Sequence, residues 1–234
     1  IYLRGQARLY DGFSPTLYRG ISNPVTQGNR HRTLNDVLDE FCSNCTLFAK
    51  MDEYVREPLL QHYGVQTTWM DIVDNAWVAL WFAVHRALVS GKENEYMHFD
   101  ARDPLVDGEF CYVILVKVGD SRRERVRKGL MKSKDSETID LRIAAPSIFL
   151  RPHVQHGLLF RSRAKNSGRE VDYSSAIAGI IRFNLRDAIN WLGTGSLHNT
   201  RGIFPPAYYD NGYQILLSFR QQERNLGVIT HIGV

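Results

Sequence analysis

The segment from Ala76 to Val84 constrains the fold more than any other part of the chain, because all of its residues are apolar. A helix that is apolar on every side is buried, and this stretch is too short to span a bilayer. Residues 65–73 directly before it are rich in β-branched and aromatic side chains, which favours a strand. The two patterns predict a helix over residues 75–88 that is capped by Asp74 and packs against a sheet.

The remaining sequence alternates between strand and helix patterns. Strands are expected over residues 17–21, 110–118, 138–144, 149–162 and 178–183. Helices are expected over residues 34–50 after Thr33, over 59–62 between Pro58 and Gly64, and over 185–191 and 209–220. No internal repeat and no Pro-, Gly- or Ser-rich linker divides the 234 residues. The sequence predicts one α+β domain over residues 1–234, with a mixed central sheet and flanking helices.

The cysteines indicate a reducing environment. There are three, and an odd number argues against a disulfide framework, which favours a cytoplasmic protein. Cys42 and Cys45 form a C-x-x-C pair, but one such pair lacks the two further ligands of a structural zinc site. We expect buried thiols, with a redox or metal role as the alternative. No run of 18 apolar residues occurs, so we expect no membrane partner.

The net charge of +4 is concentrated in one segment. Residues 122–134 hold seven Lys or Arg and one acid, Glu124, which gives +6 there and leaves −2 for the rest. One interpretation is a solvated connection, either a loop or a short helix. The other is a contact surface for the phosphates of a nucleic acid. Single-stranded RNA is the favoured partner, because its exposed bases are open to modification and stacking.

Several enzyme classes lack support in the sequence. It contains no G-x-S-x-G, no P-loop and no H-E-x-x-H, and its glycines form no Rossmann dinucleotide fingerprint.

Three separated segments carry a resemblance to a known family. They are Tyr18-Arg19-Gly20, the stretch LQHYGVQTTWMDIVDN from Leu60 to Asn75 that runs on into VALWFA, and QHGLLF from Gln155 to Phe160. Together they resemble the FRG domain family, which is named for its Phe-Arg-Gly motif, and Ile203-Phe204-Pro205 adds a weaker echo. This sequence has Gln66 where the family prefers Pro, Thr68 where it prefers Arg, and Val73 where it prefers Thr.

The FRG family in turn resembles the ADP-ribosyltransferase superfamily, which binds NAD without a Rossmann fingerprint. Those enzymes carry an Arg or His on an early strand, a Ser, Thr or Tyr on a strand before a buried helix, and a Glu or Gln on a later strand. Arg19, Thr67 with Asp71, and Gln155 occur in this order. The resemblance implies an ADP-ribosyltransferase-like fold, NAD as substrate, and these four residues as catalytic candidates.

The chemistry explains why such residues are needed. Cleavage of the nicotinamide–ribose bond develops positive charge on the ribose, so the ligand must be held rigidly. Arg19 can fork to a phosphate or hydroxyl oxygen, and Gln155 can hold the ribose 2′-hydroxyl and supply a dipole. Tyr63 or Trp69 could stack on the nicotinamide. The residues expected at the cofactor are Arg19, Gly20, His62, Tyr63, Trp69 and Asn75, and no metal ligand is expected.

Each of these residues also has a purely structural interpretation. Arg19 could pair with a surface carboxylate, and Gln155 could satisfy backbone groups at a strand edge. Asp71 and Asn75 could be caps or turn residues. His62 and His156 could be satisfied polar groups.

Two hypotheses follow. The first is an NAD-dependent ADP-ribosyltransferase, a bacterial toxin or anti-phage defence effector that modifies nucleic acid, with RNA favoured and an antitoxin as a further partner. The second is a non-catalytic FRG binding module for a nucleotide, a nucleic acid or a protein. Gln155 in place of Glu and the missing Arg at position 68 favour the second. The observation that distinguishes the two hypotheses is whether Arg19, Thr67 or Asp71, and Gln155 converge on one cleft.

Overall fold

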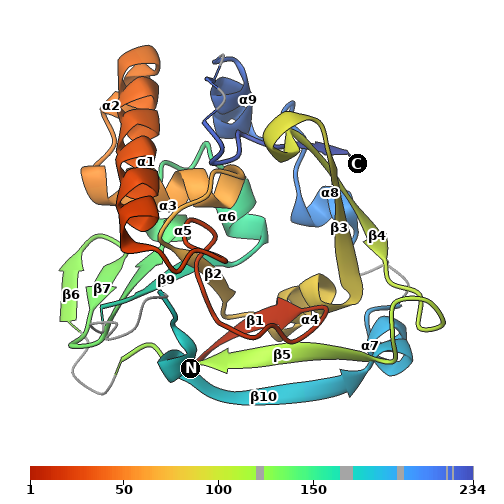
Figure 1. Ribbon diagram of the computed structural model, residues 1–234. Coiled ribbons are helices and arrows are strands. Elements are labelled where there is room, and N and C mark those ends of the chain that lie inside the picture. Colours follow the sequence, from red (N-terminus) through yellow and green to blue (C-terminus); the bar gives the residue numbers. More distant parts are fainter. Residues whose placement is uncertain (120–123, 164–170, 194–197, 220, 223, 234) are drawn as a thin grey trace.

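The computed structural model describes residues 1–119, 124–163, 171–193, 198–219, 221–222 and 224–233. Its main element is an eight-stranded sheet with the order β10-β5-β1-β2-β9-β8-β7-β6 (Figure 1). The strands are β1 (Tyr2–Gln6), β2 (Met70–Val73), β5 (Phe110–Val116), β6 (Glu124–Arg127), β7 (Leu130–Lys132), β8 (Ser136–Asp140), β9 (Gly157–Ser162) and β10 (Ile177–Asn184). Every recorded pairing in this sheet is antiparallel. The α+β class is confirmed, but the expectation of a mixed central sheet is wrong.

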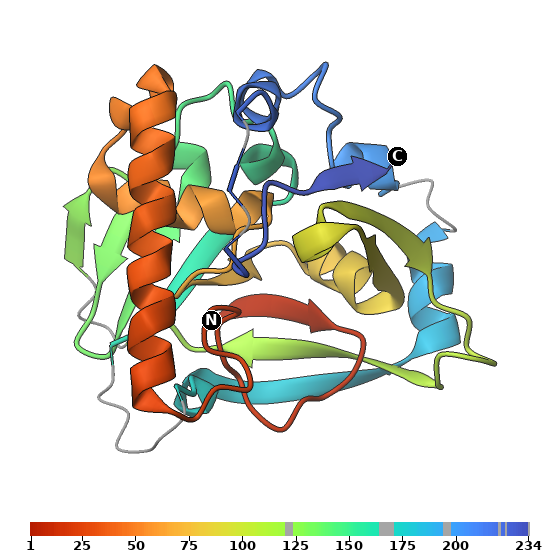
Figure 2. The ribbon, with the colours of Figure 1, turned by 45° about the horizontal axis from the view of Figure 1, so that its top comes forward.

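A second, smaller sheet has the order β11-β4-β3. Its strands are β3 (His85–Ser90), β4 (Tyr96–Ala101) and β11 (His231–Gly233). The parallel pairing that was expected in the main sheet is found here instead, between β11 and β4. Figures 1 and 2 show β3 and β4 on the opposite side of the molecule from the long helix α1.

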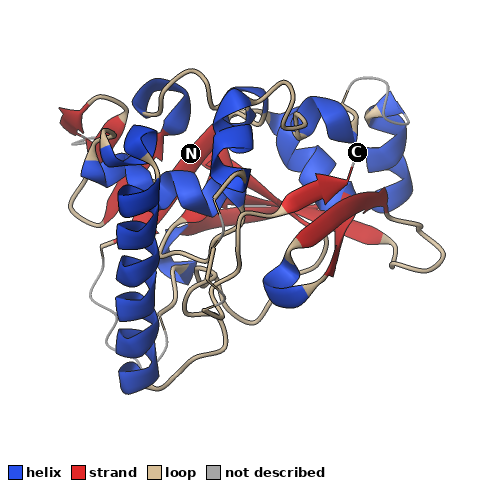
Figure 3. Ribbon diagram, turned by 90° about the horizontal axis from the view of Figure 1, so that it is seen from above, coloured by secondary structure: helices blue, strands red, loops and turns tan. Residues whose placement is uncertain are grey.

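The helices surround the main sheet (Figure 3). They are α1 (Pro24–Asn44), α2 (Thr46–Ala49), α3 (Glu53–Tyr63), α4 (Ala76–Val84), α5 (Leu141–Ala144), α6 (Arg151–Val154), α7 (Leu185–Trp191), α8 (Thr200–Ile203) and α9 (Asn211–Leu217), with 3-10 turns at Lys92–Asn94 and Ser174–Ala176. Within the described ranges, none of them is long and apolar enough to cross a bilayer.

Helix α4 is buried, as its composition predicts. Val78, Ala79, Trp81 and Ala83 have no exposed surface, although Trp77 is about half exposed. Strand β1 lies directly on this helix, since a Cβ atom added to Gly5 would stand 1.8 Å from the Ala79 carbonyl oxygen. The expected cap is wrong by one residue. The Asn75 side chain, and not that of Asp74, accepts hydrogen bonds from the first backbone N–H groups of the helix.

The end of this helix also differs from the expectation, because β3 begins at His85 where the helical pattern was expected to continue. Similarly, residues 138–144 divide into the end of β8 and α5, and residues 149–162 divide into α6 and β9. In the first two cases a strand and a helix meet without an intervening loop, and in the third a two-residue turn, Gln155 and His156, separates them. Apolar residues run through both elements, so hydrophobicity alone does not mark the junction.

The strand expected over residues 17–21 does not form. Leu17 is fully buried, but the chain turns there, with the Tyr18 N–H donating to the Pro15 carbonyl and the Ile21 N–H to the Tyr18 carbonyl. Helix α1 begins ten residues earlier than expected, at Pro24 instead of 34. Asn23 caps it by accepting hydrogen bonds from two backbone N–H groups, and Pro24 is its first residue.

Several smaller expectations are decided as well. Gly64 ends α3 as predicted, with a φ of 121°, but Pro58 lies inside that helix. The strand expected over residues 178–183 forms as part of β10, which lies at an exposed edge of the sheet. Of the basic segment, residues 124–134 are described, and β6 and β7 form a hairpin there instead of the expected loop or helix. Cys45 is buried as expected, and Cys42 is half-buried.

Candidate functional site

The central strands β1 and β2 separate from one another and leave a cleft between them. The two strands are neighbours, yet the register between them is recorded at one position, Leu3 opposite Val73. A cleft of about 570 Å³ is lined by residues of both strands. Arg4 Nη1 donates to the Asp71 carbonyl oxygen at 2.6 Å, so a side chain supplies a hydrogen bond where strand pairing is missing.

The walls of the cleft come from distant parts of the chain. The small sheet contributes residues of all three strands, and α3, α6 and the segment after α8 contribute further lining residues. Figure 2 shows β1 in the middle of the molecule with β3 and β4 beside it. Apolar or aromatic side chains on these walls include Tyr10, Phe82, Met97, Phe99, Phe204 and Ile232.

Five of the residues selected from the sequence line this cleft, namely Arg19, His62, Tyr63, Asp71 and Gln155. Residues of all three resembling segments therefore meet at one place. Arg19 is exposed and lies in a turn instead of on a strand. Gln155 is 4% exposed and ends α6 just before β9, where its Nε2 donates to the Ile203 carbonyl oxygen at 2.8 Å.

The other selected residues do not line the cleft. Thr67 is fully buried behind it, where its hydroxyl donates to Gln61 Oε1 at 2.8 Å and accepts from the Trp69 N–H. Trp69 is also buried, with the Arg161 guanidinium over its ring. Asn75 caps α4, and Gly20 occupies a turn with a φ of 70°. These residues shape the elements around the cleft and do not face a ligand in it.

Tyr63 lines the cleft, but it is not a free stacking surface. It is fully buried, its hydroxyl donates to Asp210 Oδ2 at 2.7 Å, and its ring contacts those of Phe149 and Tyr213. Burial raises the pKa of the Tyr63 phenol well above its ordinary value. The expectation that Tyr63 or Trp69 sandwiches a nicotinamide is not met, because both rings are occupied by protein neighbours. Phe82, Phe99 and Phe204 also line the cleft, but their rings contact one another, with Phe99 and Phe204 stacked at 4.5 Å. Tyr10 lines it as well, and the Arg8 guanidinium lies over its ring.

Asp71 stands at the centre of the cleft in a hydrogen-bonded group. Its Oδ1 lies 3.1 Å from His62 Nδ1, and its Oδ2 accepts from Gln61 Nε2 at 3.0 Å. Burial works against ionisation of this carboxyl. The hydrogen bonds from His62 and Gln61, together with the Arg4 guanidinium, outweigh burial and hold the pKa of Asp71 below its ordinary value. Asp71 is the sole carboxylate among the described residues that line the cleft.

Three arginines of the cleft, Arg4, Arg86 and Arg151, were not identified from the sequence. Arg4 lies on β1, a strand that the sequence patterns did not indicate, and burial holds its pKa below the ordinary value despite the attraction of Asp71. Arg151 is 1% exposed, with its guanidinium carbon 4.3 Å from the ring centre of Tyr63 and 4.4 Å from that of Tyr213. The signal that could have found it is a basic residue inside the apolar stretch 149–160.

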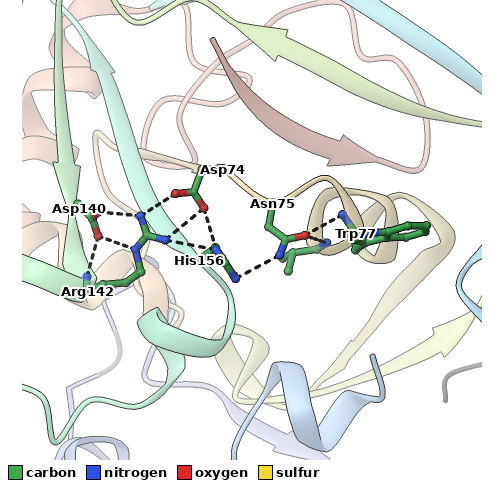
Figure 4. A network of polar contacts seen from close by, with 7 residues as sticks. Asp74, Asn75, Trp77, Asp140, Arg142 and His156 are labelled. Atoms are coloured by element: carbon green, nitrogen blue, oxygen red, sulfur yellow. Dashed lines mark hydrogen bonds and ion pairs between the residues drawn. The ribbon is translucent and has the colours of Figure 1, made fainter. Parts of the chain in front are cut away.

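A second polar group fixes the turn that carries Gln155 (Figure 4). His156 has a φ of 52°, and its Nδ1 lies 2.8 Å from Asp74 Oδ1, while Arg142 bridges Asp74 and Asp140. The Asn75 amide lies 3.2 Å from His156 Nε2. Burial opposes ionisation of Asp74, but the bonds from Arg142 and His156 lower its pKa. This group ties β2 to the start of β9, so it holds Asp71 and Gln155 in a fixed relation.

No group of three or more side chains suited to hold a metal ion occurs in the part of the chain that the structure describes.

Comparison with known proteins gives one similarity. The family model described as FRG domain matches residues 1–92, which include Arg19, His62, Asp71 and helix α4. The match ends before Arg151 and Gln155. No curated protein matches the chain, and no solved structure matches it.

Proposed function

We propose that this FRG-like chain has an ADP-ribosyltransferase-like fold, binds NAD in the cleft between β1 and β2, and transfers the ADP-ribosyl group. The observation that carries the proposal is the convergence of Arg19, Asp71 and Gln155 on one cleft. Its volume of about 570 Å³ lies within the range of small-molecule sites, roughly 300–1,000 Å³.

The charges of the cleft suit a dinucleotide. Arg4, Arg19, Arg86 and Arg151 line it, against the single carboxylate of Asp71 in the described lining. Arg86 is already paired with Asp107 at 2.9 Å, so three guanidiniums face one acid. The pyrophosphate of NAD carries two negative charges, and Arg binds phosphate oxygens with fixed, two-pronged geometry. Binding of such a ligand offsets the repulsion between the arginines.

The remaining polar groups suit bond cleavage at the ribose. The bond between the ribose carbon and the nicotinamide nitrogen breaks, and nicotinamide leaves as a neutral molecule with the bonding electrons. The ionised Asp71 stabilises the positive charge that remains on the ribose. The bond from Gln155 Nε2 to the Ile203 carbonyl oxygen fixes the orientation of the amide, and the amide oxygen would accept a hydrogen bond from a ribose hydroxyl. A nucleophile of the acceptor then attacks the ribose carbon and loses its proton.

We propose RNA as the acceptor, held by the basic hairpin of β6 and β7. Arg125, Arg127 and Lys128 are exposed there, while Arg122 and Arg123 lie outside the described residues. Tyr54 supports the hairpin, since its hydroxyl donates to the Lys128 carbonyl and the Arg127 guanidinium lies over its ring. Four strand spacings separate β6 from β2, about 20 Å. Nucleotides beyond the reacting one would contact the hairpin.

Such an activity would suit a bacterial toxin or an anti-phage effector, and an antitoxin would then be its natural partner. The second candidate is a non-catalytic module that binds a nucleotide in the same cleft. The amide of Gln155, where a transferase could use a carboxylate, favours this second candidate.

The test is incubation with NAD labelled on the adenylate, with nicotinamide release measured and the label followed into protein, RNA and DNA fractions. Arg19→Ala should weaken NAD binding by roughly 2–4 kcal/mol because a charge-assisted contact is lost. Arg186→Ala is the matched control, since Arg186 is exposed on α7 and does not line the cleft. NAD binding that depends on Arg19, without nicotinamide release, would select the binding module. Equal NAD affinity of the folded Arg19→Ala protein and the parent would remove Arg19 from the site.

A further inference from the structure

Arg151 is buried without the partners that a buried cation normally has. Its Nη1 donates to the His62 carbonyl oxygen at 3.2 Å, but its Nε and Nη2 have no hydrogen-bond partner among the described residues. The rings of Tyr63 and Tyr213 lie against the guanidinium and attract its positive charge. A buried charged group with unmatched donors is destabilising by itself.

The buried carboxylate of Asp210 binds the backbone of Arg151 and forms no recorded hydrogen bond with its guanidinium. Asp210 is fully buried, and its Oδ2 accepts from the Arg151 backbone N–H at 3.0 Å and from the Tyr63 hydroxyl, while its Oδ1 accepts from the Tyr213 N–H. These bonds hold the main chain at the start of α6. The side chain of Arg151 is left to face the cleft that it lines.

Arg102 shows what a structural arginine looks like in the same protein. It is 6% exposed, and it donates to the carbonyl oxygens of Ala83, Phe110 and Asp107 at distances from 2.6 to 3.1 Å. Arg102 does not line the cleft. The fold therefore gives both terminal nitrogens of this buried guanidinium a partner, whereas Nε and Nη2 of Arg151 have none among the described residues.

Arg4 shares this property. Its Nε is also buried without a partner in the described chain, and its Nη1 donates to the Asp71 carbonyl. Arg4 and Arg151 thus donate to the main chain of Asp71 and of His62, the two residues whose side chains form the central pair of the cleft. Two guanidiniums that keep unused donors therefore lie beside the pair of His62 and Asp71.

We propose that Arg151, together with Arg4, forms a phosphate-binding site at the inner part of the cleft. A phosphate oxygen would accept from the Nε and Nη2 groups of Arg151 that lack partners, since these lie in the plane of the guanidinium and suit two-pronged binding. This inference rests on the proposed function, because it assigns the pyrophosphate of the dinucleotide to these two arginines. Asp71 lies between the arginines and the ribose in this arrangement.

The test compares Arg151→Met with Arg102→Met, a matched pair of buried arginines. Calorimetric titration at constant ionic strength would use inorganic pyrophosphate, ADP-ribose and nicotinamide riboside, which has no phosphate. We expect Arg151→Met to weaken pyrophosphate and ADP-ribose binding at least about tenfold and to leave nicotinamide riboside unaffected. Arg102→Met should lower the melting temperature more than Arg151→Met and leave affinity unchanged, because it removes satisfied hydrogen bonds.

The outcomes separate this inference from the proposed function. Phosphate binding that depends on Arg151, in a protein that releases no nicotinamide from NAD, would support the site and refute the transferase. Release of nicotinamide from NAD with unchanged ADP-ribose affinity in Arg151→Met would refute the site and leave the transferase standing. If the parent protein binds neither pyrophosphate nor ADP-ribose, the phosphate site is wrong.

Discussion

Replacing Asp71 by Asn removes the one carboxylate of the described cleft lining and changes little else. Asn has nearly the same shape, and its oxygen can accept from Gln61 Nε2, which lies 3.0 Å from Asp71 Oδ2. Its NH₂ group can donate to His62 Nδ1, now 3.1 Å from Oδ1, if the imidazole proton moves to Nε2. The substitution therefore tests the charge and not the packing.

The magnitude follows from the role of that charge. If the ionised Asp71 stabilises the ribosyl cation, its loss should cost about 3–4 kcal/mol in the transition state, which is roughly a 10²–10³-fold lower rate of nicotinamide release. The affinity for NAD should change little or increase, because Asp71 repels the pyrophosphate in the ground state. Single-turnover release of nicotinamide, with NAD in excess of its dissociation constant, measures the chemical step directly.

Asp187→Asn is the control for this experiment. Asp187 is exposed on α7 and does not line the cleft, so its replacement removes one negative charge without touching the group that positions Gln155. A folded Asp71→Asn protein that releases nicotinamide within about threefold of the parent rate would refute the assignment. Equal losses in both variants would also refute it, because they would indicate a general effect of altered charge.

Four further changes have defined outcomes. Gln155→Ala should lower the rate of nicotinamide release about a hundredfold with a smaller effect on NAD affinity, and near-normal turnover would assign Gln155 to structure alone. Leu80→Asp should destabilise the domain by several kcal/mol, because it buries a charge in α4 beside residues with no exposed surface, and a normal melting curve would contradict this. Replacing Arg125 and Arg127 by Ser should weaken RNA binding and reduce its salt dependence without changing NAD affinity, and unchanged RNA modification would argue for a solvated hairpin. Folding lowers the pKa of Asp71, so the ionised carboxylate stabilises the protein above pH ~4. This stabilisation is lost as the pH falls through the lower pKa of the folded state. Acid unfolding of the parent and of Asp71→Asn would measure the difference.

Local patterns determined several elements of this protein without help from the tertiary structure. The apolar run of Ala76 to Val84 is a buried helix, Gly64 ends the helix before it, and residues 185–191 form α7 as predicted. These features depend on hydrophobicity and on backbone freedom of the residues themselves, so the sequence carries them directly. Three short segments also pointed to one common site, but they did so through their resemblance to the FRG family.

Other features were decided only when distant segments packed together. Strand β1 lacks a strong pattern of its own, and it forms because it pairs with β5 and lies against α4 at Gly5. The cleft exists because β1 and β2 separate, which no spacing in the sequence encodes. Thr67 occupies the right segment but turns behind the cleft, whereas Arg151 enters it without any motif. The direction of a side chain relative to a cleft depends on strand pairing and helix packing, and these are properties of the whole chain.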